Sequence, residues 1–364
     1  MRANKVLLLL LVARVCAAVD LCESAKGTCT LASDHSASSV DGDVEIAFDG
    51  TVIVKAKIQA QRIKIRCANL HLQANAILNV TGGGAASGKG TGAGIQLPST
   101  SSGGGVGGTF GGGGGLGTSS DKAAGKSYGD MASPTDLGSG GQLGRYRYSY
   151  NSYSSAGGAG GGAIEISVGG GTLKLDADAS IVANGEAGQA GAVGSTSHYG
   201  RYCGGGGGSG GSVVITASEV VGSGVIAARG GAGGKGGIKY GSTYYAGGGG
   251  GGGRVAIRAS SLDSQVIISA RGGAAGEDSS TSMSAGVGKH VLVSNRQSAL
   301  SRVLLHSVWL SVGLVSRLCR GAGLSALVRI CIRCGGDGAD HGRREQHLAH
   351  RQQPAPPRSA GRQH

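Results

Sequence analysis

The chain is poor in proline, in aromatic residues and in charge. Of its 364 residues only 5 are proline, 4% are aromatic and 15% are charged. So little proline, together with the lack of a Gly-X-Y register, excludes collagen and a proline-rich disordered chain. The scarcity of aromatic and charged side chains argues against a densely packed globular enzyme. Glycine takes 76 positions instead, and apolar residues, at 39%, are numerous enough to form a buried core.

The net charge of +13 comes mainly from the ends of the chain. Residues 289–364 hold 12 Lys and Arg against 3 Asp and Glu, whereas residues 20–288 hold 19 against 18. The nearly neutral body excludes a broad basic face for nucleic acid. Only 8 of the glycines follow residue 288. We expect 289–364 to be a basic tail that is disordered or arises from a wrong exon or reading frame; the alternative is an anchor to anionic surfaces.

Residues 1–18 have the features of a secretory signal peptide. A basic start precedes an apolar stretch at 6–12, and small residues precede the expected cleavage after Ala18. The stretch is too short to cross a membrane, so we expect no transmembrane segment there. The mature chain then begins with a cysteine-containing cap at 19–39, in an oxidising compartment. Cys22 and Cys29 are the disulfide candidates, and Cys67 and Cys203 are a further pair whose connectivity the sequence leaves open.

Four segments share one layout, which is the strongest signal in the sequence. Each has three short apolar elements that lead to a glycine turn, at 62–85, 157–188, 204–234 and 247–276. Apolar residues alternate within the elements at period two, which is typical of a strand with one buried face. Aligning the closing glycines places four aliphatic residues in one column: Leu78, Ile181, Ile226 and Ile268. The first elements align as Ile63/Ile65, Ile164/Ile166, Val213/Ile215 and Val255/Ile257, and the second start at Leu70, Leu173, Val220 and Leu262.

Three short strands per copy predict one rung of a parallel β-solenoid (β-helix). A single rung cannot bury its inward side chains, whereas stacked rungs bury them and pair their backbones. We therefore expect an all-β solenoid over 40–288 with long Gly/Tyr-rich loops between rungs, the longest being a mobile insert at 83–156. Segments 44–48 and 51–60 also alternate and are expected to cap or extend it. The alternative is a glycine-rich disordered region with scattered apolar patches.

The glycine run and the apolar alternation at 204–231 carry a resemblance to a family. They resemble the glycine-rich repeats of large secreted or cell-surface proteins, notably from protists, which are similar to pectin-lyase-like parallel β-helices. The resemblance covers roughly residues 40–288 and implies an extracellular location and a β-helix fold more than an activity. The sequence departs from the family after residue 288, where no Cys-rich modules follow.

Three motifs suggest ligands but have simpler explanations. Residues 83–90 (GGAASGKG) are close to a P-loop, yet Gly90 stands where Ser or Thr would hold magnesium, and no helix-forming run follows. Arg229 and Arg271 each precede Gly-Gly, as in RNA-binding RGG boxes, but both end a third strand, where a turn explains them. A single CxxC at 331–334 has no second pair, so we expect no metal site and no cofactor.

All ten tyrosines fall in the expected loops, and none falls on an expected strand. Stacked copies project corresponding loops to one side, so the tyrosines are expected to gather on one edge. Flat rings with a hydroxyl group suit stacking on sugars. Oxidative cross-linking in a matrix is one alternative, and a plain loop aromatic is another. The binding candidates are Tyr199, Tyr202, Tyr240, Tyr244 and Tyr245.

No constellation of residues predicts catalysis. A polyuronate lyase would need acidic calcium ligands and a basic group on neighbouring rungs. Asp176 and Asp178 could supply the first, and Arg254 and Arg258 the second. A solvated strand face explains the acidic pair more simply, so we expect no enzyme.

The leading hypothesis is a secreted or cell-surface structural or adhesive protein that displays its loops to cell-wall or matrix polysaccharide. Asn79, in the sequence's one N-glycosylation sequon, falls in an outward column and is the expected glycan site. The second hypothesis is a carbohydrate-binding or polysaccharide-lyase-like β-helix. The third, a Gly/Arg-rich nucleic-acid-binding protein, would require a cytosolic chain that keeps its N-terminus; we expect no nucleic-acid partner.

Overall fold

The computed structural model describes residues 23–25, 27–36, 42–118, 123–195, 202–239, 242–277 and 291–295. The chain divides into two units, Met1–Leu300 and Ser301–His364, and every described residue lies in the first. The expected signal peptide at 1–18 and nearly all of the expected tail lie outside the described residues. Among the described residues the regular elements are strands, with no helix.

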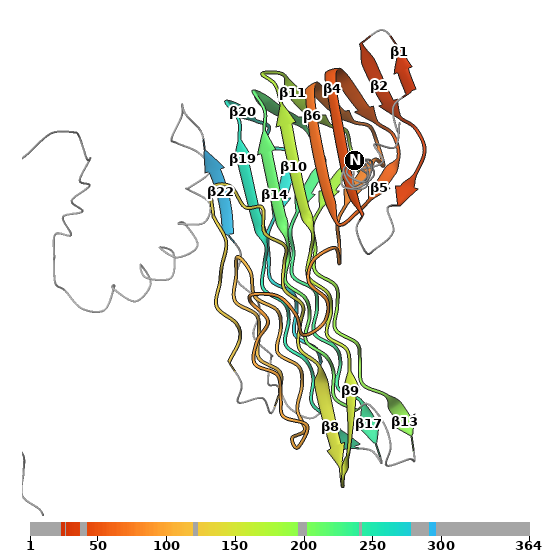
Figure 1. The fold of residues 1–364 in the computed structure, drawn as a ribbon, viewed down its shortest axis with the longest axis vertical. Helices are drawn as coiled ribbons and strands as arrows, with labels where there is room; N and C mark the ends of the chain where they lie inside the picture. The colour runs from red at the N-terminus through yellow and green to blue at the C-terminus, as the bar shows by residue number, and fades with distance from the viewer. Residues whose placement is uncertain are drawn as a thin grey trace, which may run out of the picture. The chain divides into compact units, whose positions relative to one another are not determined.

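The largest sheet contains 11 strands and is parallel apart from its first pair (Figure 1). Its main path runs β1 (Glu23–Ala25), β2 (Thr28–Leu31), β4 (Asp43–Val54), β6 (Arg62–Leu72), β10 (Ala163–Val168), β14 (Ser212–Thr216), β19 (Arg254–Arg258) and β22 (Val291–Asn295). A branch starts where the second half of β6 pairs with β11 (Thr172–Leu175), which continues to β15 (Glu219–Gly222) and β20 (Ser261–Leu262).

Three smaller sheets complete the regular structure of the described residues. A parallel sheet of six strands runs β21 (Ile267–Ser269), β16 (Val225–Ala227), β12 (Ser180–Val182), β7 (Ile77–Asn79), β5 (Lys57–Gln59) and β3 (His35–Ser36). A three-stranded sheet joins β13 (Val193–Ser195), β17 (Ile238–Lys239) and β18 (Ser242–Thr243). The strands β8 (Gly144–Tyr148) and β9 (Asn151–Ser155) form an antiparallel hairpin.

The register between copies agrees with the alignment of their aliphatic columns. Ile63 pairs with Ile164, which pairs with Val213, and Val213 pairs with Val255. The column of Leu78, Ile181, Ile226 and Ile268 is likewise confirmed, residue by residue, in the six-stranded sheet. Val44 of β4 pairs with Ile63, so the preceding segment adds a further strand, as expected.

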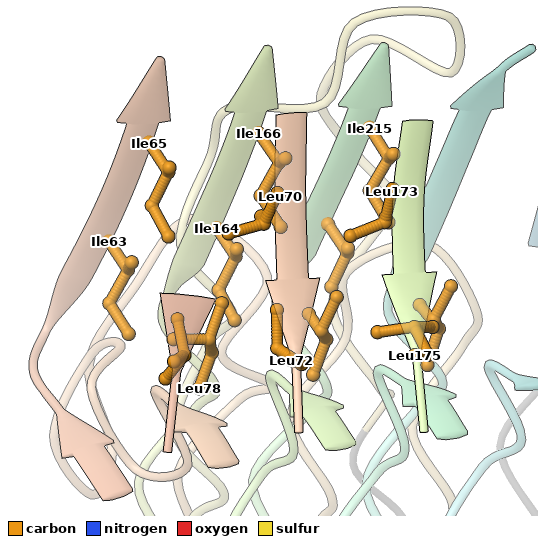
Figure 2. Close-up of a cluster of buried hydrophobic side chains, with 14 of the residues drawn as sticks. Ile63, Ile65, Leu70, Leu72, Leu78, Ile164, Ile166, Leu173, Leu175 and Ile215 are labelled. Atoms are coloured by element: carbon orange, nitrogen blue, oxygen red, sulfur yellow. The ribbon is translucent and has the colours of Figure 1, made fainter. Parts of the chain in front are cut away.

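The buried faces of the two large sheets share one aliphatic core. Figure 2 shows Ile63, Ile65, Leu70 and Leu72 beside their counterparts from the next copies. Leu72, Leu78 and Leu173 are fully buried. Burying one such side chain contributes about 1.5–3 kcal/mol, so this core is the main hydrophobic contribution to the stability of the sheets.

The prediction of a β-solenoid is wrong, because the strands form open sheets. Each copy adds strands to the 11-stranded and six-stranded sheets, but in the described part it does not close into a continuous coil. After β12, for example, the chain leaves both sheets at residue 183 and returns only as β14 at Ser212. The residues between are rich in glycine. Glycine has no side chain to fill a solenoid interior, and the backbone groups of the described glycines in this stretch find partners elsewhere.

These partners are other glycine-rich segments, and together they form a body that we call the glycine bundle. Its segments are 103–108, 138–144, 157–162, 183–191, 204–211, 228–237 and 247–253. They lie outside the sheets, except that Gly144 begins β8, yet they are joined to one another by backbone hydrogen bonds of 2.7–3.0 Å. In Figure 1 the bundle continues from the ends of β10, β14 and β19 as extended traces.

The central segment 204–211 shows how the bundle is held together. Every third N–H of this segment donates to the same neighbouring segment. Gly204, Gly207 and Gly210 donate to residues 245–251, and Gly205, Gly208 and Gly211 donate to residues 183–189. Gly206 and Ser209 donate to residues 139–142. Its carbonyl groups accept with the same period from three further segments, 105–108, 231–234 and 158–161. Three residues per turn is the period of a polyproline II helix, which makes no internal hydrogen bonds. The segment is therefore bonded to six surrounding extended segments.

Space explains why these positions are glycine. A Cβ on Gly207 would lie well under 3.0 Å from the carbonyl oxygen of Gly231. Ser209 is accommodated because its hydroxyl oxygen accepts the N–H of Ser139 at 2.8 Å. Segments 105–108 and 139–142 come from the expected insert 83–156, which thus takes part in the bundle. The glycine content reflects backbone packed directly on backbone.

Candidate functional site

The hairpin β8–β9 separates tyrosine from arginine. Tyr146 pairs with Tyr153, whereas Arg145 pairs with Ser154 and Arg147 with Ser152. Because side chains alternate along a strand, the tyrosines lie on one face and the arginines on the other. The expectation that no tyrosine lies on a strand is therefore wrong. The alternation of Tyr and Arg at 145–148 is the sequence pattern that indicates the first strand of this hairpin.

The tyrosine face of the hairpin belongs to an aromatic cluster. The rings of Tyr146 and Tyr202 lie 5.0 Å apart and edge to face, and so do those of Tyr146 and Tyr244. Tyr202 and Tyr244 are 5.3 Å apart, and Tyr153 and Tyr245 pack partly buried against the group. Such ring pairs contribute about 0.5–1.5 kcal/mol each beyond their buried area.

Three of the five predicted binding tyrosines lie in this cluster. Tyr202 is fully buried, so it offers no ring face to a ligand. Tyr244 and Tyr245 are half-buried. Tyr199 and Tyr240 lie outside the described residues. The cluster gathers tyrosines from distant segments, and its geometry is that of a small aromatic core.

Among the tyrosines that the structure describes, Tyr150 at the tip of the hairpin is the most exposed. Its side chain is 96% exposed, and that of Tyr148 is 36% exposed. Ser149 precedes Tyr150 with a φ of 54°, in the left-handed region that tight turns between strands use. Sequence reasoning did not single out Tyr150. The alternating tyrosines before it and the asparagine after it are the signals that predict a strand and its turn.

Asn79, the expected glycan site, ends β7 and is half-buried. It pairs with Gln59 on one side and Val182 on the other. Its Oδ1 accepts the N–H of Thr81 at 2.9 Å, which fixes the first and third residues of the sequon relative to each other. Glycosylation stays a prediction.

The cysteines differ in state. Cys29 is disulfide-bonded, whereas its expected partner Cys22 lies outside the described residues. Cys67 and Cys203 are free and buried. Burial raises the pKa of the Cys67 thiol to about 11 and that of Cys203 to about 12, although backbone hydrogen bonds partly oppose it. Both thiols are therefore protonated and unreactive near neutral pH.

The acidic lyase candidates lie apart from the basic ones. Asp176 contacts His71 at 2.9 Å and Lys174 at 3.2 Å, so it belongs to a surface ion pair. Desolvation raises its pKa, but hydrogen bonds from His71 and Lys174 outweigh this, and the pKa lies below its ordinary value. Asp178 is in the left-handed region with a φ of 62°. In the part of the chain that the structure describes, no ion pair links either acid to Arg254 or Arg258.

Arg254 and Arg258 instead hold a covering segment on the outer face of the large sheet. Arg254 is only 6% exposed and donates to the carbonyl of Tyr128 at 2.6 Å, with its guanidinium over the Phe110 ring. Arg258 donates to the carbonyl of Ala132 at 2.7 Å. Burial lowers the pKa of Arg254, and nearby acidic groups oppose this. The geometry gives both arginines a structural role.

The described residues contain no group of three or more His, Cys, Asp or Glu side chains placed to hold a metal ion. They also contain no helix long and apolar enough to cross a bilayer.

No protein-family model, curated protein or solved structure matches the chain. Its function is therefore argued from its own geometry.

Proposed function

We propose that this chain is a secreted or cell-surface structural protein whose glycine bundle serves as a stiff scaffold for tyrosine-bearing loops. One observation carries the proposal: the six-neighbour hydrogen bonding of segment 204–211. Every N–H of that segment has a fixed partner in another segment, so bending it would break several bonds together. Within 204–211 the only side chain beyond glycine is that of Ser209, so little in this segment can rotate to absorb deformation.

The disulfide at Cys29 supports an extracellular location. Disulfides persist in oxidising compartments and are rare in the cytosol. This agrees with the signal-peptide features of residues 1–18. The free thiols of Cys67 and Cys203 are compatible with that location, because burial protects both from oxidation.

Fractionation of the native cells tests the proposal. We expect the protein in the medium or the wall and matrix fraction, with an N-terminus at Val19 and a mass shift at Asn79 that a glycosidase removes. A chain in the cytosol that still begins at Met1 would contradict it, and would favour the nucleic-acid-binding alternative.

A carbohydrate-binding role is the second candidate, and the exposure of Tyr150 favours it. Holding a phenol ring 96% exposed at a turn gives it both faces for stacking on a sugar. Glycan-array binding that is lost in Tyr150→Ala and kept in Met131→Ala, an exposed apolar control, would support this role. Equal binding by both variants would contradict it. Release of unsaturated sugars would indicate a lyase instead.

A further inference from the structure

A groove of about 470 Å³ lies beside the glycine bundle, away from the tyrosine face of the hairpin. Two cationic side chains, Lys89 and Arg145, line it together with Ser87, Gln96 and Gln142, and no carboxylate is among its lining residues. Lys89 comes from the segment that resembles a P-loop. Arg145 lies on the arginine face of β8.

Backbone hydrogen bonds fix the position of both cationic residues. The N–H of Gly88 donates to Gly141 at 2.8 Å, and the carbonyl of Lys89 accepts from Gly140 at 3.0 Å. Gly88 and Gly90 have φ values of 71° and 101°, so Lys89 stands between two turns that favour glycine. Arg145 exchanges two hydrogen bonds with Gly103, at 2.8 and 2.9 Å.

The charges of this groove are uncompensated. Neither Lys89 nor Arg145 takes part in an ion pair with a described residue. The Nε of Arg145 is buried and has no hydrogen-bond partner in the described part of the chain; Nε and Nη1 of Arg254 are in the same state, but that guanidinium lies over the Phe110 ring. By contrast, the amides of Gln96 and Gln142 are already bonded, to Leu143 and to Gly94. The two cations are thus the groove's unused donors.

A buried donor without a partner is rare in folded proteins and calls for an explanation, such as a bound ion or water. Guanidinium and ammonium groups donate most strongly to anionic oxygens, and a guanidinium can donate two parallel hydrogen bonds. The tetrahedral head of a sulfate or phosphate monoester has three terminal oxygens and can accept from both side chains at once. We propose that this groove binds a sulfate or phosphate monoester, held by Lys89 and Arg145. This site does not depend on the scaffold role proposed above.

Four monosaccharides that differ only in the group at C6 test the site on the purified chain by calorimetry. The probes are glucose 6-sulfate, glucose 6-phosphate, glucuronate and glucose. We expect one or both esters to bind, glucuronate to bind more weakly because its carboxylate offers two anionic oxygens where an ester offers three, and glucose not to bind. The two ester arms distinguish a sulfated from a phosphorylated ligand.

Variants place the binding in the groove. Arg145→Gln and Lys89→Gln should each weaken ester binding about tenfold, because each removes a charge-assisted hydrogen bond. Lys55→Gln and Arg271→Gln remove exposed cations elsewhere and should change it less than about twofold. The Lys89 side chain makes no bond in the described structure, so Lys89→Gln keeps the fold if Arg145→Gln does not. Equal losses in all four variants, equal glucuronate binding, or no ester binding would overturn the proposal.

Discussion

Gly207→Ala is the most informative single substitution in the glycine bundle. Gly207 donates its N–H to Gly248 at 2.9 Å, and its carbonyl accepts from Gly108 at 2.9 Å. A Cβ there would collide with the carbonyl oxygen of Gly231, which is itself the acceptor for the N–H of Gly250 at 2.9 Å. One methyl group therefore strains the contact between two segments and a hydrogen bond to a third.

Three contributions set the size of the effect. Inserting a methylene-sized group into a packed interior costs about 1–3 kcal/mol. Loss of the Gly231–Gly250 hydrogen bond costs about 0.5–1.5 kcal/mol. The smaller backbone entropy of alanine in the unfolded chain offsets about 0.4–1 kcal/mol. We therefore expect Gly207→Ala to lower the free energy of unfolding by about 2 kcal/mol.

Urea unfolding followed by circular dichroism measures this change. Gly113→Ala is the matched control, because a Cβ at Gly113 meets no atom within 4 Å. It should leave the midpoint unchanged or raise it slightly. If Gly207→Ala and Gly113→Ala unfold at the same urea concentration, the packing argument for glycine is refuted.

Three further predictions concern the sheets, the ion pair and the thiols. Leu173→Ala should lower the unfolding free energy by about 2–5 kcal/mol in the same urea assay, since Leu173 is fully buried; a change under 1 kcal/mol would contradict the shared core. The pKa of Asp176 is lower in the folded chain than in the unfolded chain, so the ionised carboxylate stabilises the fold at pH values above its unfolded pKa of about 4. This stabilisation is lost as the pH falls through the folded pKa. The difference in unfolding free energy between the native chain and Asp176→Asn should therefore shrink on acidification. A constant gap would refute that assignment. Cys203, with a pKa of about 12, should resist iodoacetamide at pH 8 until urea is added, as peptide mass spectrometry would show; equal labelling without urea would contradict its burial.

The strand registers could be predicted from the sequence because aliphatic residues occur at equivalent positions in each copy. Ile63, Ile164, Val213 and Val255 recur at one place in each copy, and a one-residue slip would turn each of them to the other face. The column ending at Ile268 was predicted in the same way. The register at these positions follows from the spacing of the aliphatic residues, and that spacing can be read from the sequence.

The glycine bundle could not be predicted in this way. Its period of three belongs to backbone hydrogen bonds, and a run such as 204–208 has no side chains to mark it. The solenoid prediction failed for the same reason, since it took the segments between copies as loops between rungs, whereas the chain leaves the sheets there and bonds to other glycine-rich segments. Tyr150 was missed because the surrounding tyrosines were taken as loop residues, although their alternation with Arg145 and Arg147 indicates a strand.

Amide hydrogen exchange across 204–211 tests most directly whether the glycine runs are a folded, hydrogen-bonded body. All eight N–H groups of this segment have backbone acceptors at 2.7–3.0 Å, so they should exchange as slowly as those of β14. Exchange of 204–211 at the rate of an unstructured chain, with β14 still protected, would contradict the account.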